Sequence, residues 1–143
     1  MAFGVCFNFE DQFLYRDQWI VVCDNYLPDY VYDRNPPTVD LDDIYYKWTP
    51  VDSISDGIAR GTAEGLTPVL ITPLNAQIIP GEISLKDYTH PSNALYVFGD
   101  DNNTLDNDYG IADKVYVPSL NKQVTYWSFM TASMVLYDRM SKQ

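Results

Sequence analysis

The sequence has 143 residues, of which 46% are hydrophobic and 20% are charged, which is enough apolar material for one folded domain and argues against disorder. Its net charge of −11 opposes direct binding to nucleic acid, so any RNA contact would need a local basic patch or a partner protein. No run approaches the ~18 apolar residues of a membrane span, and the N-terminal residues lack the pattern of a signal peptide. We therefore expect a cytoplasmic protein without membrane contact.

Near the N-terminus, two short runs rich in β-branched and aromatic residues, Phe3–Phe7 and Trp19–Cys23, predict strands. Asn8 lies between them and could cap a brief helix, which would give a β-α-β opening. Residues 25–52 are rich in Tyr, Pro and Asp, and their prolines interrupt any long element. This region predicts loops, with at most one short helix over residues 40–46.

The few cysteine and histidine residues suggest no metal or nucleophilic site. Cys6 and Cys23 each lie in an apolar run, which favours buried strand residues over a disulfide. His90 is the only histidine, and because Pro91 follows it we interpret it as a turn residue. The sequence therefore indicates neither a His/Cys metal cluster nor a Ser-His-Asp set.

The middle of the chain predicts a helix followed by two buried strands. Residues 54–64 place apolar side chains at helical spacing behind Ser53, and Gly65 follows where a left-handed cap is common. Two continuous apolar runs, Pro68–Pro73 and Ala94–Phe98, are typical of strands buried on both faces of a parallel sheet.

The C-terminal third predicts a short strand over Val115–Val117 and then an amphipathic helix over about residues 122–140. The apolar residues that recur in this helix at intervals of three or four are Val124, Trp127, Met130 or Thr131, Met134 and Tyr137. We expect Val124, Trp127 and Met134 to be buried. The alternation of helices and strands predicts an α/β fold with a mainly parallel sheet and helices on both faces.

The residues that end the run at Phe98 carry a family resemblance. The segment Leu95–Leu105 is similar to the second motif of SPOUT-type RNA methyltransferases of the SpoU/TrmH branch, a strand ending in Phe-Gly-x-Glu-x-x-Gly-Leu. The residues that match in register are Phe98, Gly99 and Leu105. Asp101 stands in place of the glutamate, and Thr104 stands in place of the second glycine.

The resemblance continues toward the C-terminus. Val117-Pro118, after Asp113, resembles the family's Asp…Ile-Pro, and the same register places Thr125-Tyr126-Trp127 where the family has Ser-Leu-Asn. About residues 54 to 139 are covered, whereas the first 50 match only in outline. The alternative is an ordinary doubly wound sheet in which Gly99 only turns the chain.

The resemblance implies one SPOUT-like domain, residues 1–143, with a C-terminal trefoil knot in which the segment from Val117 onward passes through an earlier loop. It implies a homodimer that binds S-adenosylmethionine (SAM). By position in the motifs, the cofactor-binding residues would be Thr72, Pro73, Phe98, Gly99, Val117, Thr125 and Tyr126. Apart from any resemblance, ligands of open α/β sheets gather at the carboxyl ends of strands, where Thr72 and Gly99 would fall.

The activity implied is SAM-dependent methylation of an RNA, tRNA or rRNA, at a ribose 2′-hydroxyl. Arg16 and Asp101 are the candidate catalytic residues. Since arginine is a poor base, Arg16 would orient a phosphate or hydroxyl, and a plain helix-surface charge is the alternative for it.

Two further functions stay open. Trp127 stands in place of an asparagine and cannot accept a hydrogen bond, which favours a catalytically degenerate dimer that binds SAM or a protein partner. A nucleotide-binding α/β domain without a knot would need a glycine-rich phosphate cradle, and the isolated Gly81 and Gly110 do not provide one.

Overall fold

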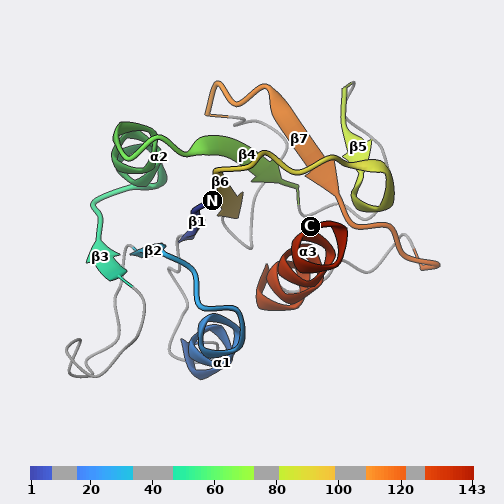
Figure 1. Cartoon of the computed structure of the whole chain (residues 1–143), viewed down its shortest axis with the longest axis horizontal. Coiled ribbons are helices and arrows are strands. Elements are labelled where there is room, and N and C mark those ends of the chain that lie inside the picture. Colours follow the sequence, from blue (N-terminus) through green and yellow to red (C-terminus); the bar gives the residue numbers. More distant parts are fainter. Residues whose placement is uncertain (8–15, 34–46, 73–80, 99–108, 122–127) are drawn as a thin grey trace.

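A computed structural model describes residues 1–7, 16–33, 47–72, 81–98, 109–121 and 128–143. In this part of the chain one sheet has the strand order β3-β2-β1-β6-β4-β7-β5, and every pairing is parallel (Figure 1). The strands are β1 (Phe3–Phe7), β2 (Tyr30–Asp33), β3 (Lys47–Pro50), β4 (Thr67–Ile71), β5 (Ile83–Ser84), β6 (Ala94–Phe98) and β7 (Asp113–Tyr116). The helices are α1 (Arg16–Tyr26), α2 (Ile54–Ala63), the short 3-10 helix η3 (Leu85–Asp87) and α3 (Ser128–Lys142).

The helices lie on both faces of the sheet. On one face α1 and α3 contact each other (Figure 1). Trp19 of α1 and Leu136 of α3 belong to the same apolar cluster as Val5 of β1. On the other face α2 packs against β1, β4 and β6, with Ile54 in a second cluster. The expected α/β fold, a mainly parallel sheet with helices on both faces, is confirmed.

Strand β6 lies in the middle of the sheet between β1 and β4, and all five of its residues are buried. Its side chains alternate between the two apolar clusters, so that Tyr96 belongs to the first and Val97 to the second. A continuous apolar run is what a strand covered on both faces requires, and the strands predicted over Ala94–Phe98 and Pro68–Pro73 are both found, the latter as β4.

Helix α2 approaches the sheet closely through its glycines. The Ser53 side chain accepts a hydrogen bond from the Asp56 N–H at the start of the helix, and Gly65 has φ +86° just beyond its end, as predicted. A Cβ added to Gly57 would lie 2.5 Å from the Cys6 sulfur, and a Cβ added to Gly61 would lie 2.6 Å from a Leu95 methyl group. Only glycine allows the helix to lie this near the strands.

The strand predicted over Trp19–Cys23 is wrong, because these residues form part of α1. Trp19, Val22 and Cys23 are buried, whereas Val21 is 58% exposed. Burial at positions i, i+3 and i+4 is helical spacing, which a five-residue apolar run does not distinguish from a strand. Cys6 and Cys23 are buried free thiols, as expected, but only Cys6 lies in a strand, because Cys23 is part of α1.

The prediction of loops over residues 25–52 is wrong where the structure describes this region. β2 and β3 lie there and extend the parallel sheet beyond β1. Pro28 precedes β2, and Pro50 ends the edge strand β3, so neither proline interrupts a central strand. The short helix predicted over residues 40–46 lies outside the described residues.

The C-terminal helix is present as α3, but its buried stripe differs from the prediction. Met134 is partly buried against the core, whereas Tyr137 is 58% exposed and Met130 is 41% exposed. The residues buried along the helix are Thr131, Ala132, Val135, Leu136 and Arg139. Because Arg139 is charged and Ala132 is small, a search for large apolar residues misses this stripe. Val124 and Trp127 lie outside the described residues.

We predict that Gly57→Ala destabilises the protein, because crowding against Cys6 outweighs the gain in helix propensity. Overpacking costs about 1 to 3 kcal/mol and the propensity gain is about 1 kcal/mol, so a net loss of about 1 kcal/mol in the free energy of unfolding is expected. Urea unfolding measures it, with Thr62→Ala, an exposed position of the same helix, as the control. A Gly57→Ala protein more stable than the wild type would contradict this packing.

Candidate functional site at the carboxyl edge of the sheet

Three neighbouring strands, β6, β4 and β7, end at the same edge of the sheet. Phe98 pairs with Ile71, and Ile71 pairs with Val115, so the strands finish level with one another. Thr72 directly follows β4, and Val117 directly follows β7. The structure therefore brings together three of the predicted cofactor-binding residues, Thr72, Phe98 and Val117, at the edge where open α/β sheets bind ligands.

The side chains of these three residues are directed into the protein. The Thr72 N–H and hydroxyl both donate to the Val115 carbonyl, at 2.9 and 3.3 Å, and the residue is 4% exposed. The Phe98 ring packs edge-on against Trp19 with centroids 5.3 Å apart, and Val117 belongs to the same apolar cluster. The described part of this edge therefore has packed apolar side chains, and the Thr72 hydroxyl joins β4 to β7.

The remaining predicted site residues are placed only in part. Arg16 is the first residue of α1. The C-terminal end of α1 leads to Asp29, which lies at the amino edge of the sheet, because its N–H donates to the Phe3 carbonyl where β1 begins. The backbone of Arg16 therefore lies toward the carboxyl edge, while its side chain is outside the description. The other predicted site residues, also outside the described residues, are Pro73, Gly99, Asp101, Thr125 and Tyr126.

The described residues offer no thiolate and no metal site. Burial, with the nearby Asp33 and Asp56 carboxylates, raises the pKa of the Cys6 thiol to about 12, and burial also raises the pKa of Cys23. Both therefore stay protonated at neutral pH and are poor nucleophiles. Within the described ranges, no group of three or more His, Cys, Asp or Glu side chains could hold a metal ion. No helix described here is long and apolar enough to cross a membrane.

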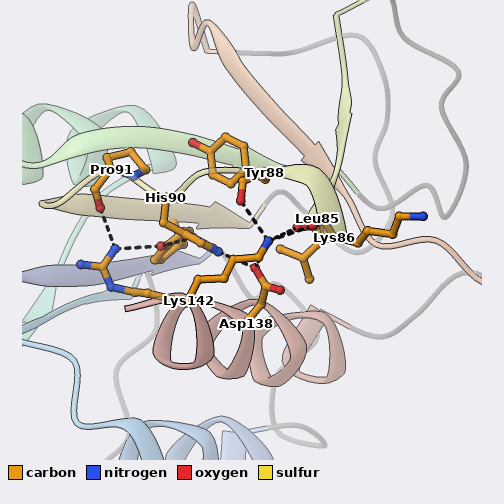
Figure 2. A network of polar contacts seen from close by, with 9 residues as sticks. Leu85, Lys86, Tyr88, His90, Pro91, Asp138 and Lys142 are labelled. Carbon is orange, nitrogen blue, oxygen red and sulfur yellow. Dashed lines mark hydrogen bonds and ion pairs between the residues drawn. The ribbon is translucent and has the colours of Figure 1, made fainter.

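A polar cluster that the sequence did not predict lies at the opposite, amino edge of the sheet (Figure 2). The His90 ring contacts Tyr96 and Asp138, and Arg139 and Lys142 of α3 bind carbonyl groups before β6. An open cavity of about 630 Å³ adjoins it. His90 does lie in a connection, as its place before Pro91 indicates. Its partner Asp138, however, is 48 positions away in the sequence. The one available signal was the pair of basic residues in the last turn of the C-terminal helix.

We predict that Thr72→Val lowers the free energy of unfolding by about 1 kcal/mol, because it removes the hydroxyl that donates to the buried Val115 carbonyl. Thr67→Val, at the exposed start of the same strand, is the matched control. Chemical unfolding of both variants measures the difference. Equal stability of the two variants would show that the Thr72 hydroxyl does not join the strands.

Comparison with solved structures identifies the fold. A TrmH-family protein from Porphyromonas gingivalis superposes with a TM-score of 0.71 at 12% identity, over 99% of this chain and 60% of that one. The SpoU methyltransferase AviRb from Streptomyces viridochromogenes, solved in complex with the cofactor AdoMet (SAM), gives 0.66 at 16% identity, over 99% and 57%. The TrmH/SpoU tRNA modifying enzyme of A. aeolicus gives 0.68 at 12% identity, over 97% and 74%.

No protein-family model and no curated protein matches the sequence. The chain spans 60% of the length of the P. gingivalis protein and 57% of that of AviRb. The likeness covers nearly all of this chain, including the first 50 residues, in which the sequence resembles the family only in outline. The chain has the fold of these SpoU/TrmH methyltransferase structures, at 12% to 16% sequence identity.

Proposed function

We propose that this chain binds SAM at the carboxyl edge of β6, β4 and β7 and acts as a divergent SPOUT-type RNA methyltransferase. The observation that carries the proposal is the likeness to SpoU/TrmH structures over almost the whole chain. The segment similar to the second motif, Leu95–Leu105, begins within β6. AviRb, one of these structures, holds AdoMet.

The residues of this edge suit a cationic nucleoside. SAM carries a sulfonium, and residues 99–108, which follow β6, include four aspartates and no lysine or arginine. Such a segment favours a cation and disfavours a polyanion. The packed side chains of Phe98 and Val117 would leave backbone groups to hold the ligand, together with Pro73, Gly99, Thr125 and Tyr126.

Methyl transfer to a ribose 2′-hydroxyl needs in-line placement of the oxygen and loss of its proton. SAM, when bound, supplies the methyl group. Arg16, at the start of α1, would orient the hydroxyl or an adjacent phosphate of a tRNA or rRNA, and Asp101 would take the place of the family's glutamate. Both assignments come from the motif resemblance.

The second candidate function is a catalytically degenerate SPOUT dimer that binds SAM or a protein partner. Trp127 in place of an asparagine and the net charge of −11 favour it, since both weaken the case for an enzyme that handles RNA alone. Under either function we propose a cytoplasmic homodimer with the trefoil knot of the family, formed from Val117 onward.

We expect SAM and its demethylated product to bind the full chain in titration calorimetry, and we expect Gly99→Val to weaken binding at least tenfold. A branched side chain at this position would obstruct the approach of a ligand to the backbone. Thr62→Ala, on α2, is the control and should bind like the wild type. Failure of the wild type to bind either ligand would contradict the proposal, and robust methylation of RNA by the isolated chain would exclude the degenerate alternative.

We expect a dimer, with twice the 16.4 kDa of one chain in light scattering. Met130 and Tyr137 are exposed apolar residues seven positions apart on α3 and so share one side of it. Tyr137→Asp should shift the protein toward the monomer, whereas Leu120→Asp, a fully exposed position outside the helices, should not. A monomeric wild type at high concentration would contradict the dimer.

A further inference from the structure

Five side chains at the amino edge of the sheet form one hydrogen-bonded unit, here called the His90 cluster: His90, Tyr96, Asp138, Arg139 and Lys142 (Figure 2). The His90 Nδ1 lies 2.7 Å from the Tyr96 hydroxyl, and its Nε2 lies 2.6 Å from an Asp138 carboxylate oxygen. The His90 side chain is only 5% exposed. Because both ring nitrogens contact protein groups, neither is available to a substrate. We therefore interpret the cluster as a structural contact and not as a catalytic site.

The two cations of the cluster attach the end of α3 to the connection between β5 and β6. Arg139 donates to the Pro91 carbonyl at 2.8 Å and to the Ser92 carbonyl at 2.7 Å. Lys142 donates to the carbonyls of Leu85, Lys86 and Tyr88 and forms an ion pair with Asp138 at 2.8 Å. The last turns of α3 are thus held by charged hydrogen bonds to one short connection, and His90 belongs to that connection.

The pattern of donors favours a neutral His90. Arg139 donates to the Tyr96 hydroxyl at 3.1 Å, so this hydroxyl directs its own proton at Nδ1 of His90, and the Nε2–H then donates to Asp138. Protonation of Nδ1 would face the hydroxyl with a second donor. Among the described residues, the Tyr96 hydroxyl has hydrogen-bond partners only in His90 and Arg139. If both of them donate to it, the hydroxyl proton has no acceptor, and Tyr96 is fully buried, where an unpaired polar group is costly.

Some of the groups around His90 raise its pKa and others lower it. The Asp138 carboxylate favours the charged ring, whereas Arg139 and Lys142 oppose it. Tyr96 on β6 and Tyr88 also face the ring, and the Tyr88 hydroxyl donates to Asp113 of β7. The other titratable or charged groups that line the adjoining cavity are Lys86 and Asp87 of η3 and the terminal residues Met1 and Gln143. Burial is the largest influence, and the net result is a pKa of His90 below its usual value.

We propose that the His90 cluster is a pH-sensitive clamp that holds the C-terminal turns of α3 while His90 is neutral and loosens them when His90 is protonated. The helix has 15 residues and so is about 22 Å long, and it runs from this clamp to Ser128, which directly follows the segment containing Thr125 and Tyr126. Resting here on the proposed function, the clamp holds the helix that begins at Ser128, two residues after the proposed SAM ligand Tyr126 in the sequence, and SAM affinity falls as the pH falls.

The sign of the stability effect follows from the lowered pKa. Between the folded pKa and the unfolded value of about 6.5, the unfolded chain binds the additional proton. The stabilisation is therefore complete above about pH 6.5 and is lost as the pH falls below it. From pH 7.5 to pH 5.5 this one group raises the unfolding equilibrium constant by at most about tenfold.

The test uses the full chain, whose single histidine makes the imidazole signals unambiguous in nuclear magnetic resonance. We expect a neutral ring protonated on Nε2 and a titration midpoint below 6.5. We also expect amide protection factors, corrected for the pH dependence of the intrinsic exchange rate, to fall more in α3 than in α2 as the pH is lowered toward 5.5. His90→Gln removes the titrating group and should remove the pH dependence of unfolding between pH 7.5 and 5.5. Asp56→Asn, which breaks the exposed ion pair with Arg60 on α2, is the control and should retain it.

A histidine that titrates at or above 6.5, or His90→Gln and wild-type proteins that lose stability in parallel over this range, would overturn the clamp. If His90→Gln does not fold, the histidine titration and the amide protection of the wild type still test the clamp. SAM affinity of the wild type is measured separately at pH 7.5 and 5.5. A clamp confirmed by these signals in a protein that binds no SAM would refute the proposed function alone, and SAM affinity equal at both pH values would overturn the coupling of the clamp to the site.

Discussion

The parallel pairing of β6 with β1 on one side and β4 on the other is the constraint on which the rest of the structure depends. Because β6 is buried on both faces, helices must cover both faces of the sheet, and the glycines of α2 let one of them approach closely. Because its register with β4 is level, the ends of β6, β4 and β7 meet at one edge. The candidate site is therefore a consequence of strand order and not of any single reactive side chain.

The sequence predicted the elements whose burial pattern is simple. Ala94–Phe98 is apolar throughout and can only be a strand covered on both sides, and the helix after Ser53 has a cap at each end. The strand predicted over Trp19–Cys23 is wrong because five apolar residues in a row fit either a strand or the buried side of a helix. β2 and β3 were missed because nearby prolines suggested loops, although Pro50 only ends an edge strand.

The candidate site follows from motif spacing in the sequence. The structure shows that Thr72, Phe98 and Val117 converge at one edge of the sheet and that their side chains pack within the protein there. The His90 cluster could not be predicted, because its members come from two parts of the chain about 48 residues apart, and a lone histidine before a proline gives no sign of burial. The candidate site and the His90 cluster thus lie at opposite edges of the sheet.

The central claim is that SAM binds where β6, β4 and β7 end. Amide chemical shifts followed during a SAM titration test it most directly, because they report the position of a ligand independently of catalysis. The account predicts that the shifts concentrate at the amides of Thr72, Phe98, Val117 and their sequence neighbours, and leave Ala94 and Leu66 at the amino ends of the strands unchanged. Shifts confined to the amino edge around Ser92 and Arg139, or no shifts at saturating SAM, would contradict it.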